Sequence, residues 1–141
     1  MKTIAVILGI ITTLGLMACN LNSKAANDLQ STKQAPENFK DFYEKFLTDE
    51  EFQLSRINFP LEGEIIDEDI EITGEIEETD WEMLTNSIYE VDTDEYQVEI
   101  KEDADEVFHR VYIQDSGVDI IEKYKRIKGK WYLVYYKSIF I

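Results

Sequence analysis

The stretch Phe46–Leu61, FLTDEEFQLSRINFPL, is where the chain changes from helical to extended patterning. At its start and just before it, large apolar side chains recur at the i, i+3, i+4, i+7 and i+8 spacing of one helix face: Phe39, Phe42, Tyr43, Phe46 and Leu47. Pro36 precedes this pattern, so a helix is predicted to begin soon after it. We expect its aromatic face to pack in the core rather than to line a ligand site.

The middle of the stretch predicts a turn and then a bend. Thr48 and Glu51 have the spacing of a capping box, which predicts a second short helical turn through Phe52. From Ile57 the apolar residues alternate as in a strand. Because Pro60 has no N–H to donate, this segment is expected to be an edge strand or a bend.

Two polar side chains in the stretch, Gln53 and Arg56, lie where the backbone leaves the helix and lacks ladder partners. Buried polar groups are costly unless they are hydrogen-bonded. We therefore expect both side chains to satisfy backbone groups or to pair with Asp49 or Glu50. A ligand contact through Arg56 is the alternative.

The rest of the chain predicts mostly strands. Residues 70–77 alternate, with Ile70, Ile72, Gly74 and Ile76 expected inward. Thr79 and Glu82 have the spacing of a further capping box, which predicts a helix carrying Trp81, Leu84 and Ile88. Extended patterns follow at 96–101, 107–114, 118–127 and 130–139, and the turn sequences Asp115-Ser116-Gly117 and Lys128-Gly129 join the last three as hairpins. Helices first and antiparallel strands last predict the α+β class.

The last hairpin carries a resemblance. Helices followed by a sheet that ends in YKRIKGKWYLVYYKS, residues 124–138, resemble the cone-shaped domains of the nuclear transport factor 2 (NTF2) superfamily, with cystatin-like architecture. The resemblance implies N-terminal helices packed on a curved antiparallel sheet. Together with the leader described next, Phe46–Leu61 resembles a family of small secreted lipoproteins of unknown function from Gram-negative gut-type bacteria. That narrower resemblance implies a fold and a location but no catalytic residues.

The first residues, MKTIAVILGIITTLGLMACN, have the pattern of an export signal. The apolar run from Ile4 to Leu16 follows Lys2 and is too short for a membrane span. Leu16-Met17-Ala18-Cys19 resembles a bacterial lipoprotein box, which implies cleavage before Cys19 and lipidation of this residue, the chain's single cysteine. An ordinary signal peptide with an incidental cysteine is the alternative. We assign 1–18 to a lipoprotein signal peptide, 19–36 to a flexible tether and 37–141 to a single α+β domain.

These assignments predict an exported protein held on a bacterial membrane by the lipid on Cys19. The outer membrane is favoured, and whether the domain faces the periplasm or the outside stays open. The formal net charge of −16 becomes −17 once Lys2 is removed with the signal. Such a charge argues against nucleic acid as a partner.

Candidate ligand-binding residues come from the strands and the corner: His109, Arg56, Tyr112, Tyr124, Trp131 and Tyr135. The alternation in 107–114 places His109, the chain's single histidine, on the side expected to face the core or a pocket. The sequence names no inward acid beside it, and no nucleophile motif is present, so no catalytic residue is assigned. The aromatic residues would stack on a sugar or a protein if one sheet face is uncovered.

The acidic segment 62–82 contains eleven carboxylates and no basic residue. Asp67, Asp69, Glu71, Thr73, Glu75 and Glu78 imitate the ligand spacing of a calcium loop. Ile72 stands where that loop needs glycine, and the isoleucine alternation indicates a strand. We therefore assign no metal ligand, and weak calcium binding stays open.

The sequence thus predicts a membrane-tethered, non-enzymatic binding or accessory module of the cell envelope, with a glycan, a peptide or an envelope protein as its ligand and no cofactor. The alternative is a small-pocket enzyme of isomerase or dehydratase type that uses His109. An enclosed cavity with His109 beside an inward carboxylate would favour the enzyme, and a filled core would remove it.

Overall fold

The computed structural model describes residues 35–141. The predicted signal, Cys19 and the tether as far as residue 34 lie outside the described residues. The elements are α1 (Phe39–Thr48), α2 (Glu50–Ser55), β1 (Leu61–Ile66), β2 (Glu71–Ile76), the 3₁₀ turns η1 (Glu78–Asp80) and η2 (Ile88–Glu90), β3 (Gln97–Glu102), β4 (Glu106–Tyr112), β5 (Val118–Ile127) and β6 (Lys130–Phe140). This is the α+β class predicted from the sequence.

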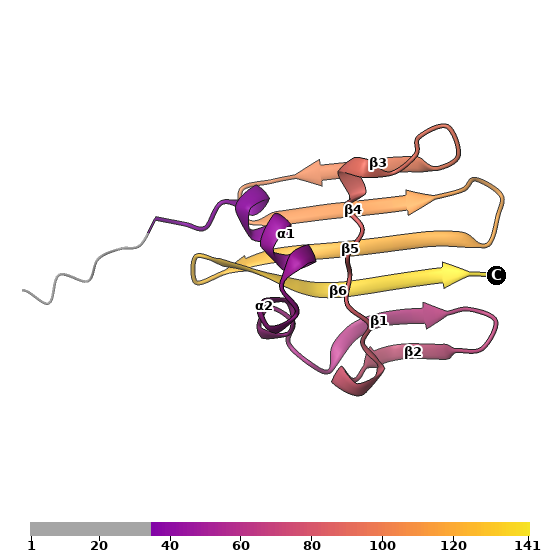
Figure 1. The fold of residues 1–141 in the computed structure, drawn as a ribbon, viewed down its shortest axis with the longest axis horizontal. Helices are drawn as coiled ribbons and strands as arrows, with labels where there is room; N and C mark the ends of the chain where they lie inside the picture. The colour runs from indigo at the N-terminus through magenta and orange to yellow at the C-terminus, as the bar shows by residue number, and fades with distance from the viewer. Residues whose placement is uncertain (1–34) are drawn as a thin grey trace, which may run out of the picture. The chain divides into compact units, whose positions relative to one another are not determined.

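The six strands form one curved, unclosed sheet in the order β2-β1-β6-β5-β4-β3 (Figure 1). All neighbours are antiparallel except β1 and β6, which are parallel. The sheet is therefore mixed rather than wholly antiparallel as expected. The cause lies at the corner after α2, where Ile57 bridges Leu133 in parallel and the Leu133 N–H donates to the Arg56 carbonyl at 3.0 Å. This contact sends the chain into β1 in the direction of β6.

The segment around Pro60 is a bend, which is one of the two forms expected, and not an edge strand. Pro60 immediately precedes β1, so its missing N–H lies outside the ladder. β1 itself is an inner strand between β2 and β6, and β2 forms the edge. In β2 only Ile76 is fully buried, whereas Ile70 before it is exposed.

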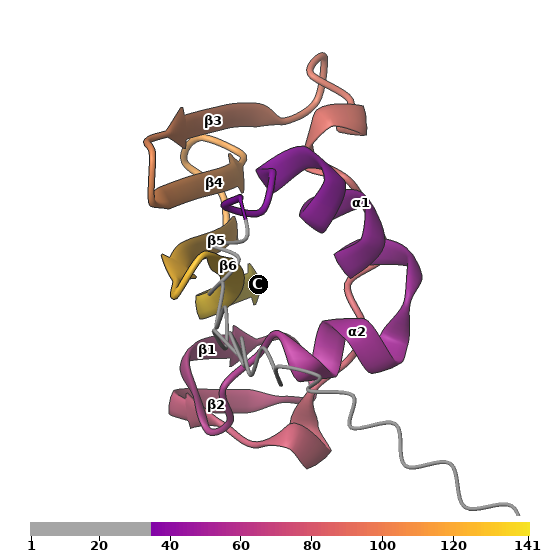
Figure 2. The same cartoon turned by 90° about the vertical axis from the view of Figure 1, so that its left-hand side faces the viewer.

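Both helices lie on the same side of the sheet (Figure 2). The predicted aromatic face of α1 is confirmed, because Phe42, Tyr43, Phe46 and Leu47 are buried. The rings of Phe42, Tyr43 and Phe46 pack around the fully buried Tyr124 of β5. The ring of Phe46, for example, lies edge-on, with 5.8 Å between the centroids. The core therefore lies between α1 and the inner face of β4, β5 and β6.

The second helix begins one residue later than predicted. Asp49 is its N-cap and accepts from the Phe52 N–H at 2.9 Å. Thr48 is the last residue of α1, where its hydroxyl donates back to the Glu44 carbonyl at 2.8 Å. An aspartate is at least as good a cap as a threonine, and here it is the residue with extended backbone.

The helix predicted over 79–88 is wrong. Residues 77–96, here called the crossing segment, contain only the two 3₁₀ turns. They connect β2 at one edge of the sheet to β3 at the other, passing over the strands between them (Figure 1). A mostly extended chain of this length spans the sheet, whereas a helix, which rises only about 1.5 Å per residue, would shorten it.

The predicted hairpins are confirmed. β4 and β5 are joined through Asp115-Ser116-Gly117, and β5 and β6 through Lys128-Gly129. Lys128 and Gly129 have φ of 51° and 83°, as a tight two-residue hairpin turn requires.

Candidate functional site

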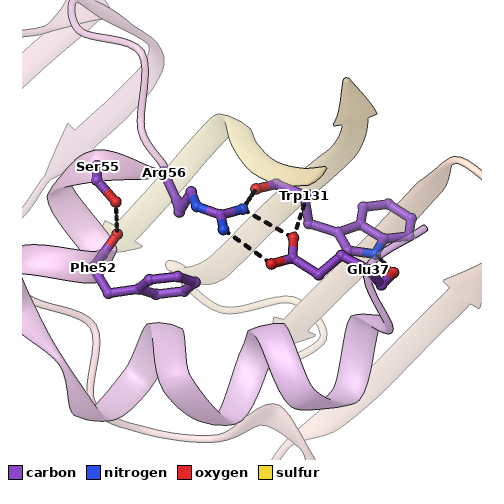
Figure 3. Close-up of polar contacts among 5 residues, drawn as sticks. All are labelled: Glu37, Phe52, Ser55, Arg56 and Trp131. Atoms are coloured by element: carbon purple, nitrogen blue, oxygen red, sulfur yellow. Dashed lines mark hydrogen bonds and ion pairs between the residues drawn. The ribbon is translucent and has the colours of Figure 1, made fainter. Parts of the chain in front are cut away.

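Arg56 is part of the corner between α2 and the sheet (Figure 3). Its guanidinium donates to both carboxylate oxygens of Glu37 at 2.9 Å and to the Trp131 carbonyl at 3.0 Å. It also lies over the Phe52 ring, 4.5 Å from the centroid. The expected role in satisfying backbone is present, but the acidic partner is Glu37 rather than Asp49 or Glu50. Its donors are directed at protein groups and not at a pocket.

His109 is the buried centre of a polar cluster on the inner face of the sheet. Only 1 % of it is exposed, and its Nδ1 lies 3.2 Å from Glu122 Oε2. The same carboxylate oxygen accepts from the Tyr124 hydroxyl at 2.8 Å. In the tautomer with the hydrogen on Nδ1, the ring donates to this carboxylate and Nε2 is an acceptor. Nε2 of His109 is buried and has no hydrogen-bond partner.

Glu122 is the site residue that the sequence did not identify. It lies directly opposite His109 in the β4–β5 ladder and is 8 % exposed. The signal that was present is alternation, since Ile120, Glu122 and Tyr124 share one side of the predicted strand. An acid at an inward position of a buried strand was the unusual feature to follow.

Tyrosine hydroxyls surround this carboxylate. Burial raises the pKa of Tyr124 well above its ordinary value, and the negative charge of Glu122 raises it further. Burial and the same charge also raise the pKa of Tyr43. Tyr136, opposite Glu122 in β6, has its pKa raised mainly by burial. All three phenols therefore keep their protons at neutral pH.

A pocket of about 500 Å³ opens beside His109 and Glu122. Its floor is the inner face of β4, β5 and β6, and its roof is part of the crossing segment. The apolar part of the lining is Met83, Leu84, Ile88, Val91, Val111, Ile120 and Phe140, and the polar part is Thr85, Asn86, Ser87, Glu90, Asp92, Tyr96, His109, Glu122 and Tyr136. A concave site that combines apolar walls with convergent polar groups can hold a small molecule.

The remaining sequence candidates do not gather at this pocket. Tyr124 contacts Glu122 but is fully buried in the core, as is Trp131. Tyr112 and Tyr135 lie on the outer face of the sheet, each half-buried under a cation: Arg110 is 4.3 Å from the Tyr112 centroid and Lys123 is 4.2 Å from that of Tyr135. The structure thus brings together His109 and Tyr124, and separates both from Arg56, Tyr112 and Tyr135.

On the outer face of the sheet, which neither helix covers, charged side chains form ion pairs with one another. Asp119 accepts from Arg110 at 2.7 Å and lies 3.1 Å from Lys137, which connects β4, β5 and β6. Burial works to raise the pKa of Asp119, but the two cations outweigh it and hold that pKa below its usual value. On this uncovered face, Asp119 thus forms ion pairs with Arg110 and Lys137.

Within residues 35–141, no group of three or more His, Cys, Asp or Glu side chains is arranged to hold a metal ion. In the acidic segment, Asp67 instead caps the β1–β2 turn by accepting from the N–H groups of Asp69 and Ile70, each at 2.8 Å. In the same described part, no helix is long and apolar enough to cross a membrane.

Comparison with known proteins gives a family and a fold. A protein-family model matches residues 37–141, which is the whole of the predicted domain. The crystal structure of an NTF2-like protein from Bacteroides fragilis has a TM-score of 0.50 at 21% identity, over 73% of this chain and 47% of that one. This chain thus spans about half the length of that neighbour. An NMR structure of a protein from Bacteroides uniformis has a TM-score of 0.48 at 21% identity, over 74% of this chain and 76% of that one. No curated protein matches.

Proposed function

We propose that this chain, which belongs to an NTF2-like family, is a lipid-anchored binding module of the bacterial cell envelope that takes a small molecule into the pocket beside His109. The observation that carries the proposal is the free ring nitrogen of His109. Glu122 occupies Nδ1, while Nε2 is buried, lacks a partner and belongs to a residue that lines the pocket. A buried polar atom without a partner is costly, and a ligand that bonds to it removes the cost.

The chemistry of this nitrogen limits the ligand. With Nδ1 protonated toward Glu122, the neutral imidazole offers Nε2 as an acceptor. The ligand then supplies an N–H or O–H group. Its remaining surface is largely apolar, because Leu84, Ile88 and Val111 line the walls. Glycan or peptide recognition through the outer tyrosines is less favoured, since cations already cover Tyr112 and Tyr135.

The single histidine makes a direct test available. The full chain carrying Cys19→Ala and ¹⁵N-labelled histidine gives one pair of ring nitrogen signals, which are followed by NMR during addition of 2-phenylethanol, an apolar ring with one hydroxyl donor. We expect the Nε2 resonance to move on binding and Nδ1 to move less. His109→Gln should weaken the affinity at least about tenfold, as expected for loss of a buried hydrogen bond. Tyr112→Phe, on the outer face, is the matched control and should leave it unchanged. Unchanged ring signals at saturating probe would overturn the proposal.

The tether is tested separately. Lipidation of Cys19 by several acyl chains would hold the chain firmly on a membrane. Wild-type protein should sediment with membranes, and Cys19→Ala should move it to the soluble fraction. A Cys19→Ala protein that stays with the membranes would contradict the anchor but not the pocket.

A second candidate function follows from the same pair of residues. A histidine that is oriented by a carboxylate and lines a pocket has the arrangement of a general base. Such a base could move a proton within a substrate: Nε2 takes it from one carbon, the electron pair shifts along the double bond, and the proton returns to another carbon. Conversion of cyclohex-3-enone to cyclohex-2-enone, followed by the absorbance of the conjugated product, tests this. A rate equal in wild type, His109→Gln and Glu122→Gln would exclude it for this class of substrate.

A further inference from the structure

Apart from His109 itself, the acidic and basic side chains that line the pocket beside it are all acidic. Three carboxylates line it, those of Glu90, Asp92 and Glu122. Among its lining residues, all of which lie in the part of the chain that the structure describes, none is lysine or arginine. The cations on neighbouring strands, such as Lys123, Arg110 and Lys137, belong to the outer face, where Arg110 and Lys137 pair with Asp119.

The three carboxylates lie at different depths. Glu122 is almost fully buried beside His109, whereas Glu90 and Asp92 are exposed on the crossing segment at the rim. Asp92 also accepts from the Asp94 N–H at 2.9 Å, which fixes its carboxylate on that turn. A molecule that enters the pocket therefore passes two negative charges and meets a third beside the unpartnered Nε2 of His109. Low-dielectric walls strengthen the effect of such charges on a bound ion.

We infer that the ligand class of this pocket is a small apolar amine, bound as its ammonium cation. The inference rests on the proposed function and adds the charge of the ligand to it. An ammonium group supplies the N–H donor that Nε2 lacks and faces carboxylates at the rim and beside the histidine. A carboxylate or phosphate ligand of the same shape meets three like charges and no cation that compensates them.

A matched series of three probes tests the charge: 2-phenylethylamine, 2-phenylethanol and 3-phenylpropionate, which share the ring and differ in the polar end. Their affinities for the full chain carrying Cys19→Ala are measured by calorimetry at neutral pH. We expect the amine to bind at least about fivefold tighter than the alcohol at low salt, and the carboxylate at least about fivefold weaker. Raising the salt to about 0.5 M should weaken the amine and leave the alcohol unchanged.

Two charge-removing double variants locate the effect. Glu90→Gln/Asp92→Asn removes the rim charges and should reduce the preference for the amine over the alcohol to about twofold or less. Asp94→Asn/Glu95→Gln removes two charges from the same crossing segment at exposed positions outside the pocket lining, and should leave the preference at wild-type level.

The outcomes separate the two proposals. An alcohol that binds as tightly as the amine overturns the amine class and leaves the pocket function standing. An equal loss in both double variants also overturns it, since the preference would then arise from the net charge of the chain. Absence of binding by all three probes overturns the pocket function and the amine class with it.

Discussion

The side-chain amide of Gln53 holds the backbone of Leu84 from both sides. Its Oε1 accepts from the Leu84 N–H and its Nε2 donates to the Leu84 carbonyl, each at 2.9 Å. Oε1 also accepts from the Trp81 indole at 3.0 Å, and Nε2 donates to the Phe46 carbonyl. One buried side chain at the end of α2 thus fixes the crossing segment that roofs the pocket.

Replacing Gln53 with leucine should therefore loosen the roof. The change leaves two backbone groups of Leu84, the Phe46 carbonyl and the indole N–H without partners, and we expect the free energy of unfolding to fall by about 3 kcal/mol. Amide hydrogen exchange in 81–88 should quicken more than in β5. Gln114→Leu, at an exposed position, is the control and should change stability by less than about 0.5 kcal/mol. A fully stable Gln53→Leu protein would contradict this role.

The same contact explains why the sequence predicted some elements and missed others. The helix of Phe39–Thr48 and the two C-terminal hairpins follow from spacing and turn residues within a few positions of each other. The helix expected over 79–88 rested on equally local signals, Thr79 and Glu82. It does not form because Gln53, distant in sequence, binds the backbone of Leu84 in a non-helical conformation. At this segment the tertiary hydrogen bonds of Gln53 outweigh the local helix propensity.

The candidate site shows the same division. The inward direction of His109 followed from alternation, but its partner required the register of two strands. Glu122 was missed because strand assignments alone do not pair residues across a hairpin. Sequence patterns could not predict the pocket, because the crossing segment and the strands β4, β5 and β6 that line it come together only in the folded chain. The role of Gln53 and Arg56 as corner residues was foreseen, whereas the Glu37 partner of Arg56 was not.

Gly63 is expected to tolerate no side chain. It lies in β1 opposite Tyr136, and an added Cβ would collide with the Tyr136 carbonyl oxygen and lie 2.9 Å from Ile76 Cδ1. Gly63→Ala should lower the free energy of unfolding by about 3 kcal/mol, because backbone and a buried side chain must both move. Gly74→Ala is the comparison. Its φ of 96° is unfavourable for alanine, but nothing lies within 4 Å of the new atom, so about 1 kcal/mol is expected. Urea denaturation of both variants checks the order, and equal losses would contradict it.

Calcium should not stabilise the protein through the acidic segment. Asp67 is engaged by the turn that it caps, and Glu71 and Glu75 project from β2 as alternate residues of an edge strand. Carboxylates arranged in a row do not enclose an ion as a calcium loop does. About 5 mM calcium should leave the melting temperature within about 1 °C of its value in chelator, beyond a matched change in ionic strength. A rise of several degrees that Asp67→Asn removes would instead establish a calcium site.

The ion pair of Glu37 and Arg56 should make stability depend on pH in the acid range. Burial works to raise the pKa of Glu37, but hydrogen bonds from Arg56 and from the Trp131 N–H, together with the Arg56 charge, outweigh it and hold the pKa below its ordinary value of 4.5. A carboxyl whose pKa is lower in the folded state contributes stability that is fully present above its unfolded pKa. That contribution is lost as the pH falls through the folded pKa.

Glu37→Gln should therefore unfold more easily than wild type at pH 7, by about 2 kcal/mol, because Arg56 loses its charged partner in a largely buried setting. The gap should shrink steadily below about pH 4.5, where wild-type Glu37 also becomes neutral. Urea denaturation of both proteins from pH 7 to pH 3 measures the gap. Glu51→Gln, at an exposed position of α2, provides the control for loss of a negative charge. A gap that stays constant across this range would mean that Glu37 acts through packing and not through its charge.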